Sequence, residues 1–236
     1  MEAQRRVVLS WSGGKDAALA LDRLRTDPSV RIDRLLTTIG QETDRSSMHG
    51  IRRELHARQA ASIGLSIDFL ALPDDPDNQT YEAIMTEVTA EYASAGIDAI
   101  AFADIYLEDV RAYREDRLDN ASLSGTWPLW GEATEDLIGS FLDRGFRATI
   151  VVIDEGKLDA GVLGEDLSRE LVEQFPDDVD PCGESGAFHT FVWDGPVFAE
   201  PVAFEQGETV TRELGETTYR YRELQPVRDD SSSTDS

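Results

Sequence analysis

Two serines, two glycines, a lysine and an aspartate fall within seven consecutive residues, SWSGGKD at positions 10–16. Glycines let backbone N–H groups approach a ligand closely, and a helix that follows them points its positive N-terminal end at the same place. A serine hydroxyl and a lysine ammonium add further donors, so the segment predicts a cradle for phosphate or pyrophosphate. The residues that we assign to this phosphate cradle are Ser10, Ser12, Gly13, Gly14, Lys15 and Asp16.

The two charged residues of the phosphate cradle suggest distinct roles. Lys15 would stabilise negative charge on a departing pyrophosphate. Asp16 would repel phosphate directly, so we expect it to hold Mg²⁺. The segment is not a Walker motif, because Leu9 stands where that motif has its first glycine. The alternative is a plain strand–helix turn that uses glycine for geometry alone.

Other polar residues follow the ends of expected strands. Thr37 closes a strand at 33–39, and Asp104 follows one at 98–102. Ligands of open α/β sheets bind beyond the carboxyl ends of the strands. We therefore expect Thr37 to contact the phosphate-bearing ligand, and Asp104 to hold Mg²⁺ or orient the substrate as a catalytic residue.

Two further segments carry histidines. His49 and Arg52 lie near one face of an expected helix at 52–63, where they could contact phosphates or the acyl substrate; the alternative is a solvated, salt-bridged face. In CGESGAFHT, residues 182–190, we expect Glu184 and His189 to act as a general acid/base or ammonia-handling pair. Cys182 is interpreted as buried and structural.

The elements that must position these residues alternate between strand and helix. Strands are expected at 6–11, 33–39, 67–72 and 98–102, and helices at 16–24, 52–63, 78–95 and 107–118. This alternation predicts a mostly parallel sheet. The second half predicts helices at 135–142 and 164–174, a strand at 148–153, and a hairpin of 210–214 with 218–224 around Gly215. We divide the chain into a domain that carries the phosphate cradle, 1–121, a smaller substrate-binding domain, 122–228, and a disordered acidic tail, 229–236.

Composition excludes several classes of protein. The 236 residues carry a formal charge of −25, which argues against a broad nucleic-acid-binding face and against a polybasic membrane anchor. No apolar run approaches the ~20 residues of a membrane span. The single cysteine excludes an internal disulfide and fits a reducing, cytoplasmic setting. The acidity is typical of a halophilic protein.

The phosphate cradle resembles the PP-loop of the N-type ATP pyrophosphatases, whose pattern is S-G-G-x-D-S. Four more segments resemble the diphthine–ammonia ligase family in a haloarchaeal-type form. They are MHGIRRELHARQA (48–60), FADIYLEDVRAYRED (102–116), PLW (128–130) and DPCGESGAFHTFVWDGPVF (180–198). The resemblance runs from Val7 to about Phe198.

The resemblance implies an α/β fold with a parallel, Rossmann-like sheet of the adenine nucleotide alpha-hydrolase type and a smaller C-terminal α+β domain. It implies an AMP-forming ligase with ATP and Mg²⁺ as cofactors, which adenylates the carboxylate of diphthine on elongation factor 2. Ammonia, taken as free ammonium, then gives the amide diphthamide. No membrane or nucleic-acid partner is expected, and homodimer formation is left open.

Two positions depart from the family pattern. Ala17 stands where the family often has serine, and Ala187 where it commonly has glutamate. These departures keep two alternatives open: a PP-loop enzyme with another small-molecule or tRNA acceptor, and a silent ATP-binding sensor.

Overall fold

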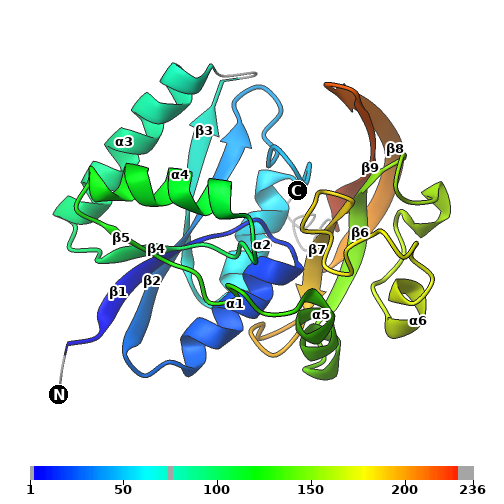
Figure 1. Cartoon of the computed structure of the whole chain (residues 1–236), viewed down its shortest axis with the longest axis horizontal. Helices are drawn as coiled ribbons and strands as arrows, with labels where there is room; N and C mark the ends of the chain where they lie inside the picture. Colours follow the sequence, from blue (N-terminus) through cyan, green and yellow to red (C-terminus); the bar gives the residue numbers. More distant parts are fainter. Residues whose placement is uncertain (1–2, 74–76, 228–236) are drawn as a thin grey trace, which may run out of the picture.

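The computed structural model describes residues 3–73 and 77–227. The described chain forms two β-sheets, with helices α1 and α2 lying between them (Figure 1). Helices α3 and α4 cover the other face of the first sheet (Figure 1). Among the described residues, no helix is long and apolar enough to cross a membrane.

The first sheet has five parallel strands in the order β3-β2-β1-β4-β5. Its strands are β1 (Arg5–Ser10), β2 (Val30–Gly40), β3 (Ser66–Leu72), β4 (Ala99–Ala101) and β5 (Ser124–Thr126). The helices that connect them are α1 (Lys15–Thr26), α2 (Arg53–Ile63), α3 (Asn78–Ser94) and α4 (Glu108–Asp119). The order reverses between β1 and β4, and such a reversal opens a ligand crevice at the carboxyl ends of the strands.

Strand β1 is buried on both faces. Val7 and Leu9 pack into the core cluster that contains α1, whereas Val8 packs into the cluster under α3 and α4. All three side chains are fully buried. When both faces of a parallel sheet are covered, its central strand consists of consecutive apolar residues. This explains the apolar residues of the RVVLSW segment.

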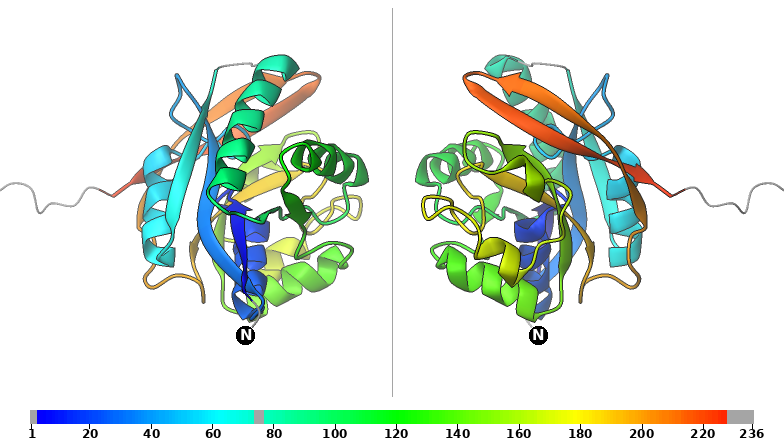
Figure 2. Two further views of the ribbon diagram at one scale, coloured as in Figure 1. Left: turned by 90° about the vertical axis from the view of Figure 1, so that its left-hand side faces the viewer. Right: turned by 90° about the vertical axis from the view of Figure 1, so that its right-hand side faces the viewer.

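The second sheet is antiparallel, in the order β7-β6-β9-β8. Figure 2 shows its β8–β9 hairpin as a long twisted ribbon. The elements of this part are α5 (Thr134–Asp143), β6 (Arg147–Asp154), the 3₁₀-helix η1 (Ala160–Val162), α6 (Arg169–Val172), β7 (Phe188–Asp194), β8 (Phe204–Leu214) and β9 (Thr217–Pro226).

The two sheets are joined by shared apolar packing. Ile51 and Leu55, at the start of α2, lie in one cluster with Val152 of β6 and Phe191 of β7. The largest cluster also includes residues of α1, β1, α5 and β7. The second sheet therefore packs against α1, the helix that follows the phosphate cradle.

The expected elements up to residue 118 are confirmed, with ends that shift by at most three residues. Strand β5 was not anticipated, because Ser-Gly-Thr carries no apolar pattern. It pairs with β4 and so extends the first sheet past residue 121. The division of the chain into domains at 121/122 stays a prediction. The acidic tail at 229–236 lies outside the described residues.

The prediction of a helix at 164–174 is wrong for most of that segment, because only the four residues of α6 are helical there. Gly164 adopts φ +91° and donates its N–H to the Ile150 carbonyl, while Leu167 donates to the Ala148 carbonyl. The first residues of the segment thus pair with β6 instead of coiling. Tertiary hydrogen bonds outweigh the helical spacing of apolar residues. The expected hairpin around Gly215 is confirmed by β8 and β9.

Candidate active site

The phosphate-cradle residues form the junction between β1 and α1. Strand β1 ends at Ser10, and α1 begins at Lys15 with Gly14 as its N-cap. Gly13 has φ +78°, a left-handed conformation that favours glycine. The Gly14 N–H donates to the Ser12 hydroxyl over 3.2 Å. The junction is therefore a tight turn that brings a helix N-terminus, a hydroxyl and a lysine to one place.

Lys15 is only 4% exposed. Its Nζ pairs with Asp16 Oδ2 at 2.8 Å and lies 5.1 Å from the ring centroid of Phe188. Burial disfavours the charged form, but Asp16 and Glu184 outweigh it and raise the pKa of Lys15 above its ordinary value. Burial likewise raises the pKa of Asp16, against the opposing effect of Lys15. Lys15 therefore stays charged in a low-dielectric site, where it attracts an anion more strongly than in water.

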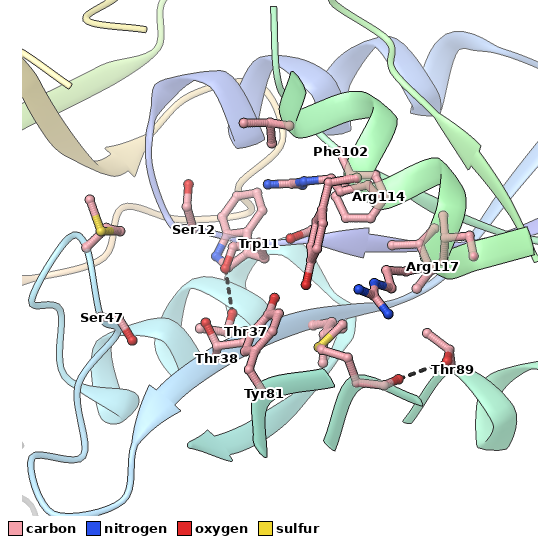
Figure 3. Close-up of a pocket in the computed structure, with 18 of the residues that line it drawn as sticks. Trp11, Ser12, Thr37, Thr38, Ser47, Tyr81, Thr89, Phe102, Arg114 and Arg117 are labelled. Carbon is pink, nitrogen blue, oxygen red and sulfur yellow. Dashed lines mark hydrogen bonds between the residues drawn. The ribbon is translucent and has the colours of Figure 1, made fainter. Parts of the chain in front are cut away.

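A cavity of about 410 Å³ opens at the carboxyl ends of β1, β2 and β4 (Figure 3). Its size falls within the range of about 300–1,000 Å³ that is usual for ligand pockets. Thr37 lines it and donates its hydroxyl hydrogen to the Trp11 carbonyl at 2.6 Å. Residues of the cavity that came from the sequence prediction are Ser10, Ser12, Thr37 and His49. These four predicted residues thus come together at one opening.

The far wall of the cavity comes from α3 and α4, which the sequence prediction did not assign to the site. Tyr81, Met85 and Thr89 of α3 line it, as do Arg114 and Arg117 of α4 (Figure 3). The spacing of four between the three α3 residues, which places them on one helical face, was an available signal.

Asp104 is held by two donors. It accepts a hydrogen bond from Trp127 Nε1 at 3.3 Å and pairs with Arg114 at 3.2 Å. The guanidinium of Arg114 also lies 4.2 Å from the ring centroid of Phe102, which lines the cavity. Asp104 thus stands at the edge of the cavity wall with a fixed orientation, and its catalytic role stays a prediction.

The segment before β7 brings Glu184 toward the cradle. Asp180 Oδ1 accepts from the N–H groups of Cys182 and Glu184, which shapes a tight loop. Glu184 Oε1 in turn accepts from the Ile105 N–H at 2.7 Å. Burial raises the pKa of Glu184, against the opposing effect of the Ile105 hydrogen bond. A carboxyl group with a raised pKa is suited to proton transfer nearer neutral pH.

Cys182 is a structural residue, as its sequence context indicated. It is 2% exposed, and its Sγ–H donates to the Thr134 carbonyl at 3.3 Å. Burial raises the pKa of its thiol to about 12. The thiol is therefore protonated at neutral pH, and the nucleophilic form of cysteine is the thiolate.

His189 and His49 lie side by side, with ring centroids 4.5 Å apart. Burial, and secondarily Lys15, lowers the pKa of His189 to about 4. Burial also lowers the pKa of His49 well below its ordinary value. Both rings are therefore neutral at pH 7. The Nε2 of His189 is buried with no hydrogen-bond partner among the described residues, and the role predicted for this histidine stays a prediction.

Glu184 and His189, predicted as a pair, make different contacts. Glu184 binds the Ile105 backbone, whereas His189 packs on His49. Lys15 is the residue that they share, because its charge affects the pKa of both. The structure thus brings both residues to Lys15 rather than into contact with each other.

Arg52 lies outside the cavity lining. It is the N-cap residue of α2, and its Nη2 pairs with Glu223 of β9 at 3.4 Å. Arg45 pairs with the same carboxylate at 2.5 Å. The contacts of Arg52 link α2 to the second sheet, and its predicted role in phosphate binding stays a prediction.

Two residues that complete the cradle were missed by the sequence prediction. Thr190 of β7 accepts the Lys15 N–H on its hydroxyl at 3.0 Å. Gln59 of α2 is fully buried and donates to the Gly13 carbonyl at 3.0 Å. Thr190 stands among the apolar residues of β7, and Gln59 shares a helical line with the buried Leu55 and Ile63. A polar residue at a position that its neighbours mark as buried is the available sequence signal.

The cradle fits a magnesium ion that arrives with phosphates. Mg²⁺ is commonly held by one or two carboxylates together with substrate phosphates and waters. The Asp16 side chain is 27% exposed beside the cradle and supplies such a carboxylate. Within residues 3–73 and 77–227, no group of three or more His, Cys, Asp or Glu could hold a metal ion. The single carboxylate of Asp16 therefore suits a cation that is also bound by phosphate, and not a metal site made of protein ligands alone.

Known proteins resemble parts of this chain. Over 170 residues it is 23% identical to a protein of Schizosaccharomyces pombe named diphthine–ammonia ligase; the match covers 67% of this chain and 26% of that protein. The chain thus spans about a quarter of the length of that curated relative. A U34-tRNA thiolase from Methanococcus maripaludis matches with a TM-score of 0.38 and 13% identity, over 60% of this chain and 58% of that one.

Family models match both parts of the chain. The diphthamide synthase N-terminal domain matches residues 5–121, from β1 through α4. The diphthamide synthase C-terminal domain matches residues 133–222, from α5 into β9. Together the two matches include the phosphate cradle, the loop of Glu184 and the adjacent rings of His49 and His189. The chain therefore belongs to the diphthamide synthase family.

Proposed function

We propose that this chain binds ATP at the cavity and cleaves it between the α- and β-phosphates. The observation that carries the proposal is the buried, charged Lys15 at the N-terminus of α1, beside a cavity that opens at the carboxyl ends of β1, β2 and β4. The cavity suits the nucleoside, and the cradle suits the phosphates. The PP-loop character of the segment 10–16 and the family membership support the same assignment.

Each cradle group has a part in this reaction. The Ser12 hydroxyl, which accepts from the Gly14 N–H, donates its own hydrogen to a phosphate oxygen. The Lys15 ammonium stabilises the charge that builds up on pyrophosphate as it leaves. Asp16 holds Mg²⁺, which when bound neutralises phosphate charge.

The acceptor is a carboxylate, and the product is its amide. A carboxylate oxygen attacks the α-phosphorus, the bond to the bridging oxygen breaks, and pyrophosphate leaves. Ammonia then attacks the acyl carbon, the C–O bond to AMP breaks, and AMP leaves with the electron pair. One proton of the attacking nitrogen passes to a base. Glu184, with its raised pKa, and the neutral imidazole of His189 are the residues that we assign to this proton transfer.

We further propose diphthine on elongation factor 2 as the acceptor, ammonium as the nitrogen source and the cytoplasm as the place of reaction. The similarity to the S. pombe diphthine–ammonia ligase and the membership in the diphthamide synthase family support this choice. The departures at positions 17 and 187 lie inside the core: Ala17 is 1% exposed and Ala187 is 2% exposed. Neither side chain lines the cavity.

The test is a reaction in concentrated KCl with Mg-ATP, ammonium and elongation factor 2 bearing diphthine. We expect AMP, pyrophosphate and a mass change of the factor from carboxylate to amide. Lys15→Ala should abolish all three. Lys157→Ala, which removes the only other lysine, is the matched control and should retain them.

Other products would redirect the assignment. AMP release without a change in the factor would show a different acceptor. ATP binding without AMP release would indicate a sensor. Release of ADP and phosphate would contradict the PP-loop chemistry itself.

A further inference from the structure

Gln59 uses both ends of its buried amide to join three segments. Its Oε1 accepts from Trp11 Nε1 at 2.9 Å. Its Nε2 donates to the Gly13 carbonyl at 3.0 Å and to the Val192 carbonyl at 2.7 Å. The side chain is fully buried. One amide of α2 therefore links the end of β1, the phosphate cradle and β7.

The Gly13 carbonyl is fixed from two directions. Besides Gln59 Nε2, the Val192 N–H donates to it at 2.9 Å. In a planar trans peptide the carbonyl and the next N–H point to opposite sides. Because the Gly13 carbonyl points toward Gln59 and Val192, the Gly14 N–H must point away from them. It points to the Ser12 hydroxyl, and Ser12 lines the cavity.

The space around Gly13 leaves the peptide little freedom. A Cβ on Gly13 would lie 2.8 Å from Gln59 Oε1 and 2.9 Å from His56 Cε1. Gln59 and His56 are both fully buried, so neither side chain can move away cheaply. Gln59 and His56 therefore form a rigid contact surface for Gly13. Of the two, Gln59 donates a hydrogen bond to the cradle backbone.

We propose that Gln59 is a positioning residue for nucleotide binding: it holds the Gly13–Gly14 peptide so that the Gly14 N–H orients the Ser12 hydroxyl, which lines the cavity, and it ties this peptide to β7. The inference rests on the proposed ATP-binding function. Gln59 does not line the cavity itself. It donates to the cradle backbone at Gly13 and accepts from Trp11, which lines the cavity but is 2% exposed and held by core packing. Its loss should therefore weaken the binding of phosphate groups more than that of the nucleoside.

The experiment measures dissociation constants of Mg-ATP and of adenosine for the full chain and for Gln59→Met, which keeps the size of the side chain and removes its donors and acceptor. We expect Mg-ATP to bind about tenfold more weakly, the ratio that corresponds to ~1.4 kcal/mol. Adenosine should lose less affinity than Mg-ATP, because Gln59 contacts the cavity wall only through Trp11. Gln59→Glu keeps an acceptor for Trp11 Nε1, and its buried carboxyl, held in the protonated form, has one O–H for the two carbonyls that Gln59 Nε2 serves. Its loss of Mg-ATP affinity should be smaller than that of Gln59→Met.

Thr149→Val serves as the stability-matched control, because it removes a buried hydrogen bond, to Asp166, within the second sheet. It should lower the melting temperature without changing the affinity for Mg-ATP. Equal Mg-ATP affinity in the wild type and Gln59→Met would overturn the inference alone. So would a parallel loss of ATP and adenosine affinity, or an equal loss in Thr149→Val. A wild-type chain that does not bind Mg-ATP would overturn the proposed function and the inference together.

Discussion

The backbone N–H of Lys15 donates to the side-chain hydroxyl of Thr190, 175 residues further along the chain, at 3.0 Å. This bond joins the first turn of α1 to β7, so the cradle is built from both sheets. Thr190 is 1% exposed, which places the contact inside the protein. The phosphate cradle and the second sheet are therefore one structural unit.

Replacing Thr190 tests this union of the two sheets. Thr190→Val removes the acceptor of a buried N–H, and a lost buried partner costs about 1–3 kcal/mol. We expect a lower urea midpoint and weaker Mg-ATP binding. Thr190→Ser keeps the hydroxyl and should stay closer to the wild type in both measurements. If Thr190→Val and Thr190→Ser behaved alike, the hydrogen bond would contribute nothing measurable.

Gly13 combines backbone strain with a lack of space. Gly13→Ala would adopt φ +78° and place its Cβ 2.8 Å from Gln59 Oε1. Gly64 has the same φ of +78°, but nothing lies within 4 Å of a Cβ there. Gly64→Ala therefore measures the strain alone, typically about 1 kcal/mol. Urea unfolding should show a larger loss for Gly13→Ala. Equal losses would mean that the crowding at Gly13 is relieved without cost.

His56 makes stability depend on pH. It is fully buried, and neither ring nitrogen has a hydrogen-bond partner among the described residues. Burial lowers its pKa from 6.5 to about 4. As the pH falls through 6.5 the unfolded chain takes up a proton that the folded chain does not, so stability falls until about pH 4. The loss of stability between pH 7 and pH 5 should be smaller in His56→Leu, measured by urea unfolding. An unchanged difference would show that His56 does not titrate in this way.

The net charge of −25 predicts a dependence of stability on salt. Like charges repel, and the screening length falls from about 10 Å at 0.1 M salt to about 3 Å at 1 M. The melting temperature should therefore rise steeply between 0.1 M and 2 M KCl. The rise should be largest below 1 M, where most of the change in screening length occurs. A melting temperature that stays constant between 0.1 M and 1 M KCl would contradict the electrostatic explanation.

Cys182 should be unreactive in the folded chain. Its thiol is buried, with a pKa of about 12, so little thiolate forms at pH 8. Iodoacetamide should leave the native protein unmodified and should alkylate Cys182 in urea, as mass spectrometry would report. Rapid alkylation of the native chain would contradict the burial of this thiol.

Local pattern was enough to predict four of the five strands of the first sheet. The apolar run of β1, the alternation of strands with helices, and the glycines before Lys15 are all written in neighbouring residues. Ser10, Ser12, Thr37 and His49 were predicted at the site and do line one cavity. Strand β5 and the segment 164–174 were not predictable in this way, because their hydrogen-bond partners lie on β4 and β6.

The sequence by itself determined the class of chemistry, since a short glycine-rich turn with Lys15 and Asp16 suits phosphate whatever surrounds it. Only the tertiary structure decided which distant residues complete the site. Thr190 reaches Lys15 across 175 residues, and Gln59 reaches Gly13 across 46. Contacts between such distant residues depend on how the two sheets pack around α1 and α2, and the spacing of residues along the chain carries no record of that packing.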